Sequence, residues 1–294
     1  MVSTKLGELV KALLLAGGTG SRIWPLSAAV NKQLLPVYDK PMIYYPLTTL
    51  MLAGATEILV ITSPDATGGM KKLLGDGSQW GISITYTIQE KPAGIPEAFI
   101  LAPESFKNSS VILMLGDNLL YGMGLGESLK QNSKLIGAKI FAYQVSNPEE
   151  YGVVVLGDDG RPNQIIEKPN NSISNLAVPG LYFFDSSVYH RVQNLQPSSR
   201  GELEIVDILN SYLDEELLQV QVLERGTAWL DTGNPMSLLA AGEFVKVIED
   251  RQGLKIGCPE EVALRIGLIT VETLEKNLSE IPEGEYKKYL RQLL

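Results

Sequence analysis

A glycine-rich turn with two nearby cations is the first feature of this sequence that could do chemistry. Gly17, Gly18 and Gly20 directly follow an apolar run. Glycine has no Cβ to block an approaching ligand, and successive backbone N–H groups in such a turn can bind anionic oxygens. Arg22 adds a fixed positive charge, and Lys32 adds a second one further along the chain. The combination predicts a phosphate site.

Two familiar phosphate motifs do not fit this turn. The dinucleotide fingerprint G-x-G-x-x-G, counted from Gly18 and Gly20, requires a third glycine where this chain has Ile23. The P-loop pattern G-x-x-x-x-G-K-[ST] has no match here. A tight turn between a strand and a loop would explain the glycines about as well. Arg22 and Lys32 favour the phosphate interpretation, because both side chains can lie along one polyphosphate.

Asp117 and Asp231 are the carboxylates best placed to bind a metal. Each follows an apolar strand-like run and precedes a small residue or a turn, in Gly-Asp-Asn and Leu-Asp-Thr-Gly. Mg²⁺ is commonly held by one or two carboxylates together with phosphate oxygens. A single aspartate in this position usually caps a loop through its own hydrogen bonds. Two of them, in a chain with a phosphate turn, favour a shared Mg²⁺.

Three further short segments carry polar groups whose role the residues alone leave open. Glu167 and Lys168 stand together before a proline, either as a surface ion pair or as ligands of a sugar hydroxyl and a phosphate. Arg200 could clamp a phosphate in a bidentate manner or pair with Glu202 or Glu204. The Tyr151-Gly152 pair either brings backbone close to a ligand or begins a strand.

The elements that must position these residues alternate between strands and helices. Apolar runs predict buried strands at 12–16, 57–62, 82–88 and 111–115, with helices from Pro41 to about residue 53, around 70–74 and around 98–101. This alternation is typical of an α/β fold with a largely parallel sheet. In such sheets ligands bind at the carboxyl ends of the strands. The glycine turn, the loop from Gln89 and Asp117 all follow predicted strands.

The second half of the chain predicts more strands and a helical end. Strands are expected at 138–145, 151–156, 164–169, 178–184, 217–223 and 228–231, and helices from Gly201, over 235–250 and over most of 259–293. We therefore expect a mixed, mostly parallel Rossmann-like sheet flanked by helices. The expected division is a core over 1–240, with lobes at 11–120 and 121–240 that share one sheet, and a helical segment over 241–294.

Composition excludes several classes of protein. The 294 residues are 45% hydrophobic and 20% charged, as in globular enzymes and binding proteins. A formal charge of −9 argues against nucleic-acid binding by bulk electrostatics.

The single cysteine, Cys258, cannot form an internal disulfide, and we expect it to be a buried small side chain in a cytoplasmic protein. The single histidine, His190, cannot build a histidine-rich metal site, and we expect a structural role on a surface helix. No run is long enough for a membrane span, and residues 1–10 lack a signal-peptide pattern.

Taken together, these motifs resemble the sugar-1-phosphate nucleotidylyltransferases, and within that family the type that uses dTTP and glucose 1-phosphate. The resemblance runs from Lys11 to the C-terminal helices. It is carried by seven motifs in order: Leu15-Ala-Gly-Gly-Thr-Gly-Ser-Arg22, Asn31-Lys-Gln-Leu-Leu-Pro-Val37 with the residues to Pro46, Leu115-Gly-Asp-Asn118, Tyr151-Gly-Val-Val154, Glu167-Lys-Pro169, Arg200-Gly-Glu-Leu-Glu-Ile205 and Trp229-Leu-Asp-Thr-Gly233.

The resemblance implies a reaction and a role for each motif. A sugar-1-phosphate oxygen attacks the α-phosphorus of the nucleotide in line, giving dTDP-glucose and pyrophosphate, the first step toward dTDP-rhamnose and related deoxysugars. Arg22, Lys32, Asp117 and Asp231 would be catalytic, with Mg²⁺ on the two aspartates. The nucleotide would contact Gly17, Gly18, Thr19, Gly20, Arg22, Lys32, Gln33, Gln89, Gly94 and Asp117. The sugar phosphate would contact Asn118, Tyr151, Gly152, Glu167, Lys168, Val178 and Arg200.

The sequence departs from the pattern of that family at three places. Ser21 stands where the family has threonine and keeps a hydroxyl. Pro96-Glu97 stands where Ala-Gln is usual, in a loop that bears on the nucleotide. Pro179 replaces a threonine beside the sugar pocket. The nearest alternative is therefore the same chemistry with UTP or another sugar phosphate. A separate alternative is a catalytically silent sugar-nucleotide-binding regulator on the same fold. A dinucleotide-dependent oxidoreductase is disfavoured by Ile23.

The tail also matches the thymidylyltransferase type, in Arg251-Gln-Gly-Leu-Lys255 and Cys258-Pro-Glu-Glu261. In that group the tail helps to build a homotetramer and a second, regulatory nucleotide site. We expect a homotetramer, with a dimer as the alternative, and a regulatory nucleotide site. Neither a nucleic acid nor a membrane is an expected partner.

Overall fold

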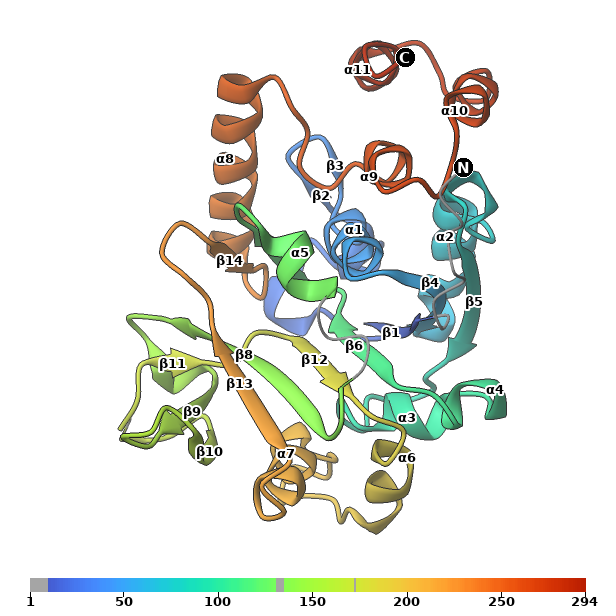
Figure 1. Cartoon of the computed structure of the whole chain (residues 1–294). Helices are drawn as coiled ribbons and strands as arrows, with labels where there is room; N and C mark the ends of the chain where they lie inside the picture. The colour runs from blue at the N-terminus through green and yellow to red at the C-terminus, as the bar shows by residue number, and fades with distance from the viewer. Residues whose placement is uncertain (1–9, 131–134, 172) are drawn as a thin grey trace, which may run out of the picture.

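A central sheet with helices on both faces organises the chain (Figure 1). The structure is a computed structural model that describes residues 10–130, 135–171 and 173–294. The sequence predicts no signal peptide in residues 1–10. Of these residues the structure describes only Val10, so this prediction lies outside the described range. The expected mixed α/β fold, mostly parallel in its first half, is confirmed.

The parallel part of the sheet comes from the first half of the chain. In spatial order it contains β5 (Ser83–Ile88), β4 (Ala55–Thr62), β1 (Val10–Ala16) and β6 (Val111–Leu115). Each neighbouring pair of these strands is parallel. All four agree with the predicted strands to within two residues at each end. Their apolar runs are continuous because both faces of a parallel sheet are covered.

The second half of the chain extends the same sheet. β12 (Leu181–Phe184) pairs antiparallel with β6, and β8 (Ala138–Gln144) follows it. Beyond β8 lie β11 (Leu176–Ala177), β9 (Gly152–Leu156) and β10 (Pro162–Glu167), while β13 (Leu218–Val222) pairs parallel with β8. The ten-stranded sheet thus runs through both of the expected lobes, whose boundaries stay a prediction.

Alternate residues of the strands build two cores. Leu14 of β1 faces a cluster with α1 (Tyr44–Leu52), α2 (Pro64–Leu74), α5 (Leu125–Lys130), α9 (Pro259–Arg265) and α10 (Val271–Leu278). Leu13 faces the opposite cluster with α3 (Glu97–Leu101), α4 (Glu104–Lys107), α6 (Val188–Arg191) and α7 (Ile205–Leu213). Figure 1 shows α1, α5 and α9 above the sheet and α3, α6 and α7 below it.

The helical end of the chain is confirmed as α8 (Pro235–Gln252), α9, α10 and α11 (Glu285–Arg291). α8 packs on α1 and on the hairpin of β2 (Pro36–Val37) and β3 (Lys40–Pro41) through a third small core. A further pair, β7 (Asn118–Tyr121) with β14 (Ala228–Asp231), lies outside the main sheet. Short 3-10 turns complete the structure at Ser21–Ile23 (η1), Lys32–Leu34 (η2), Ser78–Trp80 (η3), Pro148–Glu150 (η4) and Val192–Asn194 (η5). Within the described residues, none of the helices is long and apolar enough to cross a lipid bilayer.

Three predicted boundaries are wrong. The helix expected from Pro41 begins at Tyr44, because Lys40 and Pro41 pair with β2 instead. The helix expected from Gly201 begins at Ile205, because Leu203 bridges to Gly94 in a neighbouring loop. The single strand expected at 178–184 is broken, since Pro179 lacks the N–H that a central strand would need.

Candidate active site

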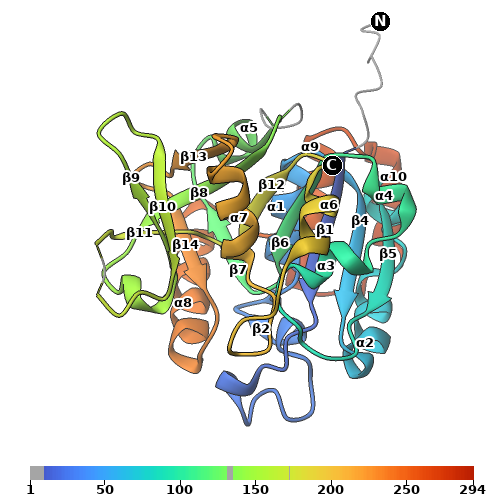
Figure 2. The ribbon, with the colours of Figure 1, turned by 90° about the horizontal axis from the view of Figure 1, so that it is seen from below.

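The glycine turn leaves the carboxyl end of β1 and stays open. Gly20 adopts φ 64°, a conformation that favours glycine, and its carbonyl accepts a hydrogen bond from Ser27 Oγ at 2.8 Å. A Cβ on Gly18 would meet no atom within 4 Å, so nothing covers the turn there. Figure 2 shows the blue loop that follows β1 projecting beyond one end of the sheet. The turn is therefore accessible to a ligand, and Arg22 lies in η1 directly after it.

Lys32 is held inside the site by a short capped turn. Asn31 accepts a hydrogen bond from the backbone N–H of Gln33 at 3.0 Å and so begins η2. Lys32 is only 5% exposed, and its Nζ donates to Asp117 Oδ2 at 2.5 Å. A buried ammonium needs such a partner. This contact joins the cation predicted beside the glycine turn to one of the predicted metal ligands.

The two aspartates lie on one cavity although they are far apart in the chain. Asp117 follows β6, and Asp231 ends β14, where it pairs with Asn118 of β7. Thr232 strengthens the junction, since its Oγ1 donates to the Asp117 carbonyl at 2.8 Å. Burial, with the negative charge of Asp117 as the second cause, raises the pKa of Asp231. Two carboxylates that line one cavity, with Asp231 buried beside the negative charge of Asp117, form a site suited to a cation.

Asn118 orients Asp117 rather than facing the cavity freely. Its Oδ1 accepts from Trp229 Nε1 at 2.6 Å and from the Gly180 N–H at 3.1 Å. Its Nδ2 therefore faces Asp117 Oδ1, at 2.9 Å. Sequence reasoning placed Asn118 with the sugar phosphate and quoted Trp229 as part of a motif without giving it a role of its own. The available signal was the position of Trp229 on the strand that ends at Asp231.

The predicted sugar-phosphate residues mostly share this cavity, whose volume is about 160 Å³. It is lined by the predicted Arg22, Asp117, Asn118, Tyr151, Gly152, Glu167, Lys168, Val178 and Asp231. Gly152 allows a close approach, since a Cβ there would lie 3.1 Å from Glu167 Oε2. The lining residues to which sequence reasoning assigned no site role are Ile95, Leu115, Glu150, Ile165, Gly180, Tyr182, Ile205, Val206, Leu209 and Trp229.

Charges at the rim of the cavity are partly paired among themselves. Lys168 Nζ lies 3.8 Å from Glu167 Oε1, and Arg200 Nη2 lies 3.9 Å from the same oxygen. Arg200 does not line the cavity, and its closer partner is Glu204 Oε2 at 2.6 Å. Burial raises the pKa of Glu167, while Lys168 and Arg200 oppose that rise. The ion pairs are half exposed, so an incoming phosphate can compete for both cations.

The predicted nucleotide residues Gln33, Gln89 and Gly94 lie outside the walls of this cavity. Gln89 packs beside the glycine turn, where a Cβ on Gly17 would lie 2.5 Å from Gln89 Oε1. Gly94 has φ 103° and bridges to Leu203. Gln33 packs against Gly116, and its buried Oε1 has no hydrogen-bond partner among the described residues. Gln89 and Gly17 thus lie together, following β5 and β1, the strands on either side of β4.

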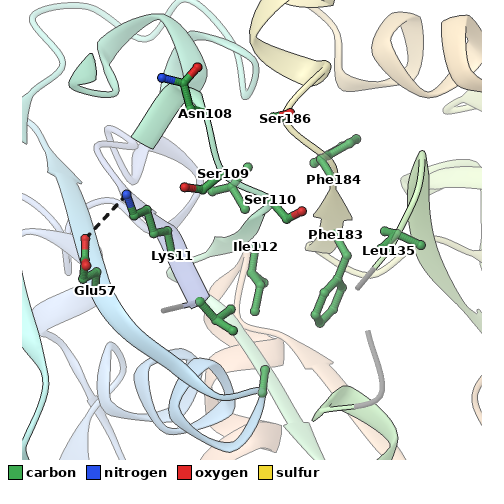
Figure 3. Close-up of a pocket in the computed structure, with 13 residues that line it drawn as sticks. Lys11, Glu57, Asn108, Ser109, Ser110, Ile112, Leu135, Phe183, Phe184 and Ser186 are labelled. Atoms are coloured by element: carbon green, nitrogen blue, oxygen red, sulfur yellow. Dashed lines mark ion pairs between the residues drawn. The ribbon is translucent and has the colours of Figure 1, made fainter. Parts of the chain in front are cut away.

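A larger cavity, of about 360 Å³, lies elsewhere (Figure 3). Its walls include Lys11, Glu57, Ser109, Ser110 and Phe183, and none of the predicted site residues. Val10 and Lys11 begin β1, so this cavity lies at the end of the strand opposite the glycine turn. Lys11 is already engaged by the Ser105 carbonyl and lies 3.9 Å from Glu57. The larger of these two cavities is therefore not the candidate active site.

Two aspartates make up the protein's share of the candidate metal site. In the part of the chain that the structure describes, no group of three or more His, Cys, Asp or Glu could hold a metal ion. A cation here would need further oxygen ligands, and Mg²⁺ commonly takes these from substrate phosphates and water. The residues present fit a Mg²⁺ that arrives with a nucleotide.

The predictions for the two lone residues agree with the structure. Cys258 is 1% exposed, and burial raises the pKa of its thiol well above the usual range. His190 is exposed on α6. Neither lies on the cavity of Asp117 and Asp231.

Comparison with known proteins agrees with the motifs and the geometry. A model of the family described as nucleotidyl transferase matches residues 11–247. Glucose-1-phosphate thymidylyltransferases of Mycolicibacterium smegmatis and Neisseria meningitidis are 48% and 49% identical to this chain, each over 97% of it and 99% of the relative. The chain belongs to the nucleotidyl transferases, and within them to the glucose-1-phosphate thymidylyltransferases.

Two solved structures have the same fold. A Bacillus anthracis protein assigned as a glucose-1-phosphate thymidylyltransferase, crystallised with sucrose, is 36% identical with a TM-score of 0.74. The match covers 80% of this chain and 94% of that protein. A UDP-glucose pyrophosphorylase in complex with UDP-glucose has a TM-score of 0.70 and is 21% identical in sequence. That match covers 82% of this chain and 99% of that protein. The second match concerns the fold alone.

Proposed function

We propose that this chain transfers the thymidylyl group of dTTP to glucose 1-phosphate, giving dTDP-glucose and pyrophosphate. The observation that carries the proposal is the meeting of Asp117 and Asp231 on one cavity beside Arg22 and Lys32. A phosphate oxygen of the sugar attacks the α-phosphorus, and the bond to the pyrophosphate oxygen breaks. The enzyme forms no covalent intermediate, and its work is positioning and charge neutralisation.

The glycine turn and the two cations would bind the triphosphate. Backbone N–H groups of Gly17, Gly18, Thr19 and Gly20 would face its oxygens. Arg22 and Lys32 would neutralise the charge that develops on the transferred phosphoryl group and the pyrophosphate. Asp117 and Asp231 would hold Mg²⁺, which supplies charge neutralisation between the two substrates when bound. Gln33, Gln89 and Gly94 would contact the nucleoside.

The opposite side of the cavity would bind glucose 1-phosphate. Tyr151, Gly152, Glu167 and Val178 would surround the sugar, and Lys168 and Arg200 would bind its phosphate. Asn118 lies between the two sides and would hold Asp117 in place. We also extend the proposal to a cytoplasmic location and to a homotetramer or dimer. Association is supported by the exposed apolar side chains of Met236, Leu239 and Val247 along α8.

Pyrophosphate release over a grid of nucleotides and sugar phosphates tests this function. The grid pairs dTTP, UTP, dCTP and ATP with glucose 1-phosphate, galactose 1-phosphate and mannose 1-phosphate, with Mg²⁺ and with EDTA. We expect the highest kcat/KM with dTTP and glucose 1-phosphate, and none with EDTA. A higher kcat/KM with UTP would favour UTP as the nucleotide substrate. The absence of pyrophosphate release with every pair of substrates would favour a sugar-nucleotide-binding regulator.

Lys168 offers a separate prediction about the sugar side. Lys168→Ala is expected to raise the KM for glucose 1-phosphate on the order of tenfold, because one charge-assisted contact to the phosphate is lost. The effect on kcat should be small, since the contact exists before and during the reaction. Lys107→Ala, at a partly exposed lysine of α4 that pairs with Glu104, is the control. An unchanged KM in Lys168→Ala would remove that residue from the sugar-phosphate site.

A further inference from the structure

Glu97 holds the side chain of Gln89 in one orientation. Glu97 begins α3, and its Oε2 accepts from Gln89 Nε2 at 2.6 Å. The same oxygen accepts from the Ala93 N–H at 3.3 Å, which ties the carboxylate to the loop between β5 and α3. An ionised carboxylate can only accept hydrogen bonds. The NH₂ group of Gln89 must therefore be the end that faces Glu97.

The amide oxygen of Gln89 is consequently directed to the other side. Gln89 is only 4% exposed, and its backbone N–H donates to the Thr62 carbonyl at 2.8 Å, so the residue is firmly anchored. Its Oε1 lies against Gly17, at the beginning of the glycine turn. The structure thus presents a hydrogen-bond acceptor of fixed orientation beside the predicted nucleotide site.

We propose that Glu97 is a positioning residue that sets the choice of base through Gln89. The inference rests on the proposed function, in which Gln89 contacts the nucleoside. Thymine and uracil carry a ring N–H at N3 that can donate to Gln89 Oε1. Cytosine carries an acceptor at the same ring position, so its N3 would face another acceptor. The fixed amide therefore selects dTTP and UTP against dCTP.

A glutamine at position 97 would impose this choice less firmly. Its amide carries both an acceptor and donors, so it can pair with either end of the Gln89 amide. Gln89 could then turn its NH₂ toward the base and donate to cytosine N3, at the cost of the 3.3 Å contact with the Ala93 N–H. The carboxylate of Glu97, which stands where the family usually has glutamine, removes that freedom.

Comparing kcat/KM for dTTP and dCTP in matched variants tests the proposal. In Glu97→Gln we expect the ratio of dTTP to dCTP to fall on the order of tenfold, as for one hydrogen bond that loses its fixed orientation. The change should appear in the KM values of the two nucleotides, while kcat and the KM for glucose 1-phosphate stay near their original values. Glu90→Gln removes the same charge from an exposed position in the same loop and should leave the ratio unchanged.

The outcomes separate this inference from the proposed function. If the original chain releases no pyrophosphate with any nucleotide, the proposed function fails. If it is active and Glu97→Gln is active with the original ratio, the role of Glu97 is overturned. A thermal melt establishes that each variant is folded. Glu97→Met, of similar volume and without a carboxylate, is the second variant, and it must lower the ratio as well.

Discussion

Replacing Asp117 by asparagine is expected to lower kcat on the order of 10³-fold, at the upper end for the loss of one electrostatic stabiliser. The substitution keeps the shape of the side chain and removes the charge that faces both Lys32 and the candidate metal site. Lys32 would then lack its anionic partner in a buried position. Rates of pyrophosphate release at saturating dTTP, glucose 1-phosphate and Mg²⁺ measure the effect.

Asp231→Asn should give a loss of similar size, because both carboxylates are needed on the same cavity. Asp158→Asn, at an exposed turn between β9 and β10, changes the charge equally and serves as the control. Titration of activity with Mg²⁺ adds a second measurement, since weakened metal binding raises the concentration needed for half-maximal activity. Near-normal rates in either Asp117→Asn or Asp231→Asn would refute the metal assignment.

Glu249→Ala is expected to lower the free energy of unfolding by about 3 kcal/mol, as for a buried ion pair that loses one partner. Glu249 of α8 is 7% exposed and accepts from Lys40 Nζ at 2.8 Å and from Lys255 Nζ at 2.9 Å. Its Oε1 also accepts from the Ile256 N–H at 2.9 Å. Asp39, which contacts both lysines, would remain as a partner and limit the loss.

Urea unfolding followed by circular dichroism measures this loss. Asp250→Ala is a matched control, because Asp250 is the next residue on α8 but pairs with Lys246 at the surface. Exposed pairs of this kind contribute about 0.5 kcal/mol or less. Equal midpoints for Glu249→Ala and Asp250→Ala would mean that the buried cluster does not hold α8 to the β2–β3 hairpin.

Local patterns in the sequence were enough to predict what depends on a single segment. The apolar runs before Gly17, Gln89 and Asp117 predicted strands whose carboxyl ends meet, and the structure brings these ends together. The resemblance to a known family supplied the residue roles, which no single run could have given. Arg22, Lys32, Asp117 and Asp231 were named on motifs and are found around one cavity or in contact with its walls.

Features that depend on long-range pairing could not be predicted in this way. Leu119 and Leu120 form too short an apolar run to identify β7 without its partner β14. The bridge from Leu203 to Gly94 shortened α7, and nothing local indicates it. Trp229 and Glu97 have orienting roles only because Asn118 and Gln89 reach them in the fold.

The pairing of β7 with β14 also orders events during synthesis. Asp117 reaches its place when β6 joins the sheet, but Asp231 arrives only when the chain up to β14 has left the ribosome and closed onto β7. A nascent polypeptide that ends before β14 contains the segments of the glycine turn and of the parallel strands. Such a polypeptide has Asp117 but not Asp231. The candidate metal site is therefore complete only after β14 has been synthesised.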